Sequence, residues 1–292
     1  MSSHEYNLGL SINNEVIGLS LQERIANIID SVGYFGVAAR DLTQGRELFI
    51  NADETFNTAS VIKVPIMIEL FRRVYEDNVS LDDRLILEDR FRTGGSGILK
   101  EFRSGLQLTL WDLCVAMIAL SDNVATNMLI DYLGIDAINR CMDSLGAHNT
   151  RLHRMVGFKS IKPDQPKGLG RTTPRDMMMI FQKLAEGDVI SESASEEMIA
   201  ILAKQHDRNM IPRLLPIDYD SVSGDYDSAI VANKTGAVDG VRNDVALIRF
   251  ADGRQWVICI LTKDLRDLSW KVDHEGEIAI AKIALEIYKE WI

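Results

Sequence analysis

Three short patterns of polar residues in this chain could carry out chemistry, and they follow one another along the sequence. They are Ser60-Val61-Ile62-Lys63, Ser121-Asp122-Asn123 and Lys234-Thr235-Gly236. At about 6% usage per residue type, the first pattern is expected about once by chance in a chain of this length, and each tripeptide only about 0.06 times. The first pattern alone is weak evidence, but the ordered set of three is strong evidence of a functional site.

The first pattern places a hydroxyl one helical turn before an amine. Residues three apart on a helix lie on one face, so the Ser60 hydroxyl and the Lys63 amine can meet. The neighbours Val61, Ile62 and Val64 are apolar, and burial among them would lower the pKa of the amine. A neutral amine can take the serine proton and make the oxygen a nucleophile. Taken alone, these two residues would fit an ordinary surface helix.

The other two patterns each have a chemical and a structural interpretation. Ser121-Asp122-Asn123 lies between two predicted helices, where Ser121 could relay a proton and the Asn123 amide could hold a substrate carbonyl. All three residue types are also good helix N-caps. Lys234-Thr235-Gly236 ends a predicted strand, where a cation and a hydroxyl could bind a carboxylate and glycine would let the backbone approach the substrate. By itself, this tripeptide is also typical of a strand-end turn.

Together, the three patterns resemble the motifs S-x-x-K, S-D-N and K-T-G of the class A β-lactamases, which are penicillin-recognising serine enzymes. Other segments resemble class A landmarks in the same order, namely Thr58-Ala59-Ser60, Gly95–Leu99, Leu120–Gly134 and Thr172-Thr173-Pro174. The interval of 61 residues from Ser60 to Ser121 is close to the family's, and the 113 residues from Ser121 to Lys234 suggest a loop insertion. The resemblance covers the chain from about Tyr34 to its last residue.

The resemblance implies a catalytic role for four residues. Ser60 would be the nucleophile, and Lys63 the base or proton shuttle of acylation. Ser121 would pass the proton to the leaving nitrogen, and Lys234 would tune Ser121 electrostatically.

The same resemblance implies a set of substrate-binding residues, which are Asn123, Thr235, Gly236, Ala237 and Arg242. Asn123 would bind the substrate amide and Thr235 the substrate carboxylate. The backbone N–H groups of Ser60 and Ala237 would form an oxyanion hole that stabilises the tetrahedral intermediate. Arg242 is a weaker candidate for carboxylate binding, because its offset from Lys234 differs by about one residue from that of the family's arginine.

One catalytic residue of the class A enzymes has no counterpart here. Between their second and third motifs, these enzymes carry a glutamate that activates the deacylating water. The matching segment of this chain has Val156 at the glutamate position and Ser160 at that of its partner asparagine. Loss of a positioned general base costs about 10²–10⁴-fold in rate. We therefore expect Ser60 to be acylated and the acyl-enzyme to be hydrolysed slowly, unless Lys63, His153 or Asp164 acts as the base.

The same segment is basic within an acidic protein. Its basic residues are Arg151, Arg154, Lys159, Lys162, Lys167 and Arg171, and Asp164 is its only carboxylate. In the family, an acidic residue pairs with the arginine that corresponds to Arg154. In this chain, Gly170 stands near the position of that acid. The segment could be a solvated loop, or a lip that attracts an anionic substrate.

The leading hypothesis is therefore a β-lactamase-like serine hydrolase acting on a small molecule with a carboxylate. An esterase or D-alanyl peptidase on the same scaffold is a second hypothesis. A third is a binding protein that traps an acyl group without turning it over.

Alternating helix and strand patterns indicate an α+β fold of the β-lactamase type. Helices are expected at Leu19–Val32, Ser60–Asp77, Thr109–Leu120, Asn123–Leu133, Pro174–Ala185, Ser193–Lys204 and His274–Ile292, and strands at Tyr34–Arg40, Glu47–Asn51, Ile230–Lys234, Val241–Phe250 and Gln255–Thr262. This order predicts an antiparallel sheet with flanking terminal helices, formed by residues 1–57 and 205–292. An all-helical domain of residues 58–204 would be inserted into it, with the active site between the two.

Composition excludes several classes of protein. The 292 residues include 43 acidic and 32 basic side chains, a net charge of −11, which disfavours binding to nucleic acid or to an anionic membrane. The scattered cysteines Cys114, Cys141 and Cys259 indicate buried thiols, and no histidine or cysteine spacing indicates a metal or another cofactor. The segment Met1–Glu5 does not begin a signal peptide. We therefore expect a cytoplasmic protein, or a secreted one whose signal has been removed.

Overall fold

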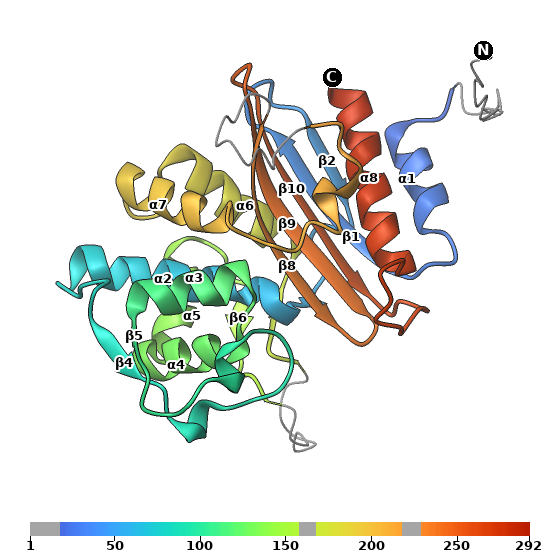
Figure 1. Ribbon diagram of the computed structural model, residues 1–292. Helices are drawn as coiled ribbons and strands as arrows, with labels where there is room; N and C mark the ends of the chain where they lie inside the picture. The colour runs from blue at the N-terminus through green and yellow to red at the C-terminus, as the bar shows by residue number, and fades with distance from the viewer. Residues whose placement is uncertain (1–17, 158–167, 218–228) are drawn as a thin grey trace, which may run out of the picture.

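The computed structural model describes residues 18–157, 168–217 and 229–292 (Figure 1). Its centre is a five-stranded antiparallel sheet with the strand order β2-β1-β10-β9-β8. The strands are β1 (Tyr34–Asp41), β2 (Glu47–Ile50), β8 (Ala229–Val238), β9 (Val241–Phe250) and β10 (Gln255–Lys263). Because β1 pairs with β10 along its whole length, segments from both ends of the chain form one sheet, as the sequence predicts.

Two terminal helices, α1 (Leu21–Ile29) and α8 (Glu275–Trp291), cover one face of this sheet (Figure 1). The N-terminus of α1 is fixed by a capping box, in which the side chains of Ser20 and Glu23 each bind the other's backbone N–H. Apolar residues of both helices, such as Ile25 and Ile283, pack with alternate residues of the strands, such as Trp256, in one core.

A mostly helical region covers the opposite face (Figure 1). Its helices are α2 (Lys63–Glu76), α3 (Leu110–Ala119), α4 (Asn123–Leu133), α5 (Ile135–Ser144), α6 (Pro174–Glu186) and α7 (Glu192–Leu202). Short 3-10 helices occur at η2 (Ala59–Ile62), η3 (Asp89–Phe91), η4 (Leu99–Glu101) and η5 (Ile211–Leu214). Helix α6 packs directly on β1, β9 and β10, so the second core continues from the sheet into the helical region.

The expectation that residues 58–204 are all-helical is wrong for several short stretches. A three-stranded antiparallel sheet consists of β3 (Phe56–Asn57), β7 (Gly170–Thr172) and β6 (Arg151–Leu152), and a second pair consists of β4 (Arg84–Ile86) and β5 (Gln107–Thr109). Strands of two or three residues are too short to show an alternating pattern. They matter for function because β3 leads directly into the turn that contains Ser60.

The α+β architecture is confirmed, and most predicted elements are found within a few residues of their expected ends. The predicted helix over 60–77 is a 3-10 turn followed by α2. Helix α5 has no counterpart in the prediction, because Gly134 alone separates it from α4 and was expected to end the helical segment. No helix within the three described ranges is long and apolar enough to cross a membrane.

The three cysteines are free and buried, as the sequence predicts. Burial raises the pKa of the Cys114 thiol and that of the Cys141 thiol to about 12. It also raises the pKa of Cys259. A thiol that stays protonated is a poor nucleophile and metal ligand, so these side chains serve as small apolar groups in the core.

Candidate active site

The candidate nucleophile, Ser60, lies in the tight turn η2 between β3 and α2. In a 3-10 helix the side chains at i and i+3 eclipse one another, so Ser60 and Lys63, the first residue of α2, share a face. Ala59 has φ = 44°, a left-handed conformation that alanine rarely adopts. Its N–H donates a hydrogen bond to the Asn57 side chain at 3.0 Å. Backbone strain held by the surrounding structure is common at functional sites.

Lys63 is fully buried, and its amine is held by the second motif. Its Nζ lies within hydrogen-bond distance of three acceptors, the Ser121 carbonyl at 2.7 Å, Ser121 Oγ at 3.0 Å and Asn123 Oδ1 at 2.9 Å. Burial, together with the nearby charge of Lys234, keeps the pKa of Lys63 well below its ordinary value. Among the described residues, no hydrogen bond joins Lys63 to Ser60, so direct proton transfer between them stays a prediction.

The Ser121 hydroxyl lies between two buried lysines. It accepts a hydrogen bond from Lys63 Nζ at 3.0 Å and another from Lys234 Nζ at 3.2 Å. A hydroxyl has two acceptor lone pairs and one donor proton, so both lone pairs are occupied and the proton can point at a bound molecule. Ser121 also has a left-handed backbone, with φ = 52°. The structure thus brings Lys63, Ser121 and Lys234 together.

The buried carboxylate of Asp122 fixes the second motif in place. One oxygen caps α4 by accepting from the N–H groups of Val124 and Ala125, each at 2.9 Å. The other accepts from the N–H groups of Ile98 at 2.7 Å and Leu99 at 2.9 Å. Asp122 is therefore a cap, as its residue type suggests, and also links α4 to the start of η4.

The side-chain amide of Asn123 is already partly engaged. Its oxygen accepts from Lys63, and its nitrogen donates to the Gly94 carbonyl at 3.0 Å. An amide nitrogen carries two N–H donors, so one donor remains for a substrate carbonyl.

The third motif lies on β8, the edge strand of the large sheet, next to the serine turn. Lys234 is fully buried, and its Nζ donates to the Thr235 carbonyl at 2.8 Å in addition to Ser121. A Cβ built on Gly236 would lie 2.7 Å from the Ser60 nitrogen and 2.9 Å from the Thr58 carbonyl oxygen. Since both neighbours are backbone atoms, only glycine fits here, and Ala237 follows directly. This contact agrees with the close approach predicted from the motif.

The β8–β9 register places Arg242 opposite Ala237, but within the described residues its side chain forms no hydrogen bond to another predicted site residue. Its buried guanidinium pairs with Glu277 of α8 at 2.9 Å and donates to the carbonyls of Val238, Val241 and Ser269 at 2.9–3.0 Å. A substrate carboxylate would have to compete with Glu277 for this guanidinium. The carboxylate-binding role expected for Arg242 is therefore not supported, and its position favours a structural role at the end of the sheet.

Sequence reasoning missed Asp244, a buried carboxylate on β9 behind the third motif. It accepts hydrogen bonds from Asn233 Nδ2 and from the Ile211 N–H, each at 3.0 Å. Burial raises the pKa of Asp244 to about 7. Burial lowers the pKa of Lys234 to about 8, while the charges of Asp207 and Asp244 act in the opposite direction. No motif contains Asp244, and only the antiparallel register, which places it opposite Thr235, reveals it.

The segment that lacks a glutamate is anchored near α4. The Val156 N–H donates to Asn127 Oδ1 at 2.8 Å, and Asn127 Nδ2 donates to the Val156 carbonyl at 3.0 Å. The side chain of Val156 brings no proton acceptor to the site. Ser160 and Asp164, also considered above, lie outside the described residues.

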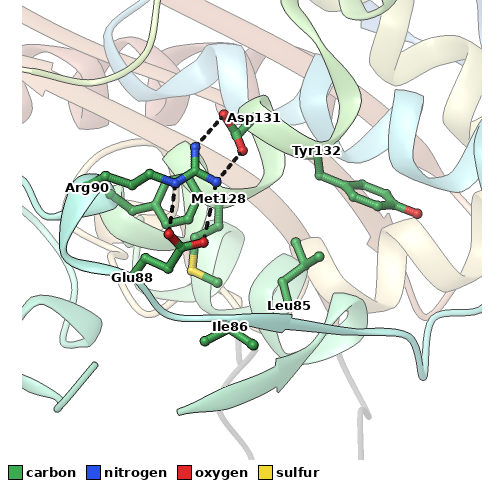
Figure 2. Close-up of a pocket in the computed structure, with 8 residues that line it drawn as sticks. Leu85, Ile86, Glu88, Arg90, Met128, Asp131 and Tyr132 are labelled. Atoms are coloured by element: carbon green, nitrogen blue, oxygen red, sulfur yellow. Dashed lines mark hydrogen bonds and ion pairs between the residues drawn. The ribbon is translucent and has the colours of Figure 1, made fainter. Parts of the chain in front are cut away.

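A separate pocket of about 100 Å³ lies between β4, η3 and α4 (Figure 2). Figure 2 shows Arg90 between Glu88 and Asp131, with which it forms ion pairs at 3.2 Å and 2.9 Å. None of the residues of the three motifs lines it. Within the described part of the chain, no group of three or more His, Cys, Asp and Glu side chains is placed to hold a metal ion.

The α+β fold and the three assembled motifs define a class A β-lactamase-like hydrolase. The chain belongs to the beta-lactamase enzyme family, whose sequence model matches residues 20–291.

Known relatives agree with this assignment. A β-lactamase of Rhodobacter capsulatus is 27% identical over 275 residues, which cover 93% of this chain and 89% of that protein. The crystal structure of a β-lactamase from Sphaerobacter thermophilus is 33% identical, with a TM-score of 0.83, and the match covers 92% of this chain and 96% of that one. A mutant of PBP-A, solved as an acyl-enzyme complex with penicillin G, is 25% identical, with a TM-score of 0.78 and coverage of 93% and 96%.

Replacing Gly236 with alanine should disable the site without unfolding the protein. The new Cβ would meet the Ser60 backbone at 2.7 Å and displace the serine turn. Because a misplacement of about 1 Å can cost about 10²-fold in rate, we expect a loss of that order in benzylpenicillin adduct formation, measured by intact-protein mass spectrometry. Gly157→Ala, where a Cβ would meet no atom within 4 Å, is the matched control, and melting temperatures monitor folding. Equal rates in both variants would contradict the proposed close approach.

The rate of adduct formation should fall as pH rises through about 8, the pKa of Lys234, because the neutral amine no longer attracts an anionic substrate. Asp244→Asn removes an anion that favours the lysine cation, so the alkaline limb should move to lower pH. The charged groups acting on Asp244 include Asp207 and Arg208, and both are kept in this variant. Asp252→Asn, at an exposed turn, is the control. An unchanged alkaline limb in Asp244→Asn would show that Asp244 does not tune Lys234.

Proposed function

We propose that this protein is a serine hydrolase that is acylated on Ser60 by a β-lactam or a related amide or ester bearing a carboxylate, and that it hydrolyses the acyl-enzyme slowly. The observation that carries the proposal is the Ser121 hydroxyl held between two buried lysines, next to the strained turn that contains Ser60. This arrangement provides a base, a proton donor and a cation within one hydrogen-bonded group.

Acylation would begin when Ser60 Oγ attacks the substrate carbonyl and its proton passes to the neutral amine of Lys63. The lowered pKa of Lys63 supports this role, because a protonated amine cannot accept a proton. The N–H groups of Ser60 and Ala237 would stabilise the oxyanion. When the C–N bond breaks, Ser121 would give its proton to the leaving nitrogen and regain one from Lys63, which restores both groups.

The substrate carboxylate would bind at β8. Lys234 supplies the positive charge there and Thr235 the hydroxyl, in line with the charge-assisted hydrogen bonds that carboxylates form. Asn123 would hold the substrate amide through its remaining N–H.

Slow deacylation follows from the valine at position 156. Hydrolysis of the ester needs an activated water, and the side chain of Val156 cannot accept a proton. Burial and the charges of Arg171 and Arg154 lower the pKa of His153, so His153 is the neutral base nearest in sequence. Its backbone N–H is fixed to the Leu169 carbonyl at 2.9 Å.

A lasting acyl-enzyme is the second candidate outcome, favoured by the same valine and by the similarity to PBP-A, a mutant of which was captured as an acyl-enzyme with penicillin G. In that case the protein would be an acyl trap for β-lactams, or an esterase or D-alanyl peptidase that turns over only a less hindered ester or a peptide.

Intact-protein mass spectrometry after exposure to benzylpenicillin and to a p-nitrophenyl ester separates these functions. We expect one adduct per chain with benzylpenicillin that persists well beyond its time of formation, and none with Ser60→Ala. A transient adduct with the ester alone would identify an esterase. Rapid multiple turnover of benzylpenicillin would refute slow deacylation, and the absence of any adduct on Ser60 would refute the proposed function.

A carboxylate at position 156 should speed deacylation. Val156→Glu supplies a general base on a backbone already fixed by Asn127, and a positioned base contributes about 10²–10⁴-fold, so we expect the adduct lifetime to fall at least about tenfold. Val156→Gln, which has the same size but no charge, is the matched control. Equal lifetimes in the two variants would show that a base at this position cannot reach the ester.

A further inference from the structure

Three basic side chains gather at the two ends of the segment without a glutamate. His153 and Arg154 follow β6, and Arg171 is the central residue of β7, which pairs with β6. The His153 N–H donates to the Leu169 carbonyl at 2.9 Å, and Arg154 Nε donates to the Gly168 carbonyl at 3.0 Å. These bonds hold the two ends together. We call the two arginines, Arg154 and Arg171, the cationic cluster; His153 lies beside them, and burial and their charges lower its pKa.

The cationic cluster adjoins the turn that contains the nucleophile. Strand β7 pairs with β3, with Arg171 opposite Asn57, and the Thr58 N–H donates to the Gly170 carbonyl at 3.1 Å. Ser60 is two residues further along the chain. Strand β7 also contacts η2 itself, so the backbone that carries Arg171 lies beside the serine turn.

The charge of the cationic cluster is not neutralised by any described carboxylate. Neither Arg154 nor Arg171 forms an ion pair within residues 18–157, 168–217 and 229–292, whereas Arg151, opposite Arg171 in the same sheet, pairs with Asp143. His153 Nδ1 is buried and has no hydrogen-bond partner among those residues. In a chain with a net charge of −11, unpaired cations beside a reactive site favour an anionic ligand.

We propose that the cationic cluster is a subsite for a second carboxylate, and that the preferred substrates are dianions with an acidic group on the acyl side chain. This inference rests on the proposed function, in which Lys234 and Thr235 hold the first carboxylate. That carboxylate lies on the leaving-group side of a β-lactam, so a second anion of the substrate would be carried by its acyl side chain. A guanidinium can bind a carboxylate through two parallel N–H bonds, and Arg171 is exposed and available for this.

The test compares carbenicillin with benzylpenicillin, which lacks only its side-chain carboxylate. The measured quantity is the ratio of their second-order rate constants of adduct formation, carbenicillin over benzylpenicillin, in the unmodified protein and in each variant. We expect Arg171→Gln to lower this ratio about threefold, the effect of one exposed ion pair, and Arg154→Gln/Arg171→Gln to lower it further. High salt should reduce the ratio of the unmodified protein.

Two control variants keep the test specific to charge. Arg151→Gln removes an arginine of the same sheet that already has a carboxylate partner, and Arg171→Lys keeps the charge at position 171. Both should retain the ratio of the unmodified protein to within about twofold. Because Arg154 also donates a hydrogen bond to the Gly168 carbonyl, the melting temperature of each variant is measured. If the variant that carries Arg154→Gln unfolds, the ratio in Arg171→Gln alone tests the subsite.

The same ratio can be measured as binding in Ser60→Ala, by titration calorimetry with the two penicillins, so the inference is tested even if Ser60 proves unreactive. A selective loss of carbenicillin binding or acylation in Arg171→Gln supports the subsite. An unchanged ratio in the double variant, or equal losses with both penicillins, overturns it. Absence of adducts together with a carbenicillin preference that depends on Arg171 would refute the proposed function and leave the subsite standing.

Discussion

The site depends on burying two lysine amines against one hydroxyl. Removing an ammonium group from water costs several kcal/mol, and a second cation nearby adds to that cost. The charges around the two lysines differ. Burial and the charge of Lys234 lower the pKa of Lys63 against the opposing charge of Asp122, whereas the charges of both Asp207 and Asp244 oppose the lowering of the pKa of Lys234. Asp122, the carboxylate next to Ser121 in the sequence, accepts hydrogen bonds from four backbone N–H groups. It therefore fixes the backbone of the second motif.

Close backbone contacts then set where the nucleophile lies. Gly236 of β8 leaves no room for a side chain beside the Ser60 nitrogen, and Gly170 of β7 is packed equally closely, since a Cβ there would lie 3.0 Å from Thr58 Oγ1 and 2.4 Å from the Arg151 carbonyl oxygen. Strands of two different sheets thus meet the same short turn. The left-handed backbone of Ala59 is tolerated because these neighbours determine the conformation of the turn.

Much of this site was predictable from sequence, since the three motifs are local patterns in a known order, and the long strands and helices have clear periodicity. The remainder depends on tertiary register. Lys63 binds Ser121 and Asn123, which motif spacing cannot reveal, and Asp244 is found only through its pairing with β8. The position of Arg242 could not be predicted, because an offset along a strand does not show which partner the guanidinium takes. The strands of two or three residues form only because their neighbours align them.

The pairing of β1 with β10 has a consequence for synthesis of the protein. More than 200 residues separate Phe35 from its partner Thr262, so the ribosome must release nearly the whole polypeptide before the middle of the sheet can close. Until then, β1 and β2 expose an apolar edge that can pair with another chain. Contacts so distant in sequence also slow folding. Nascent chains of this protein are therefore expected to need protection by chaperones until the last strand emerges.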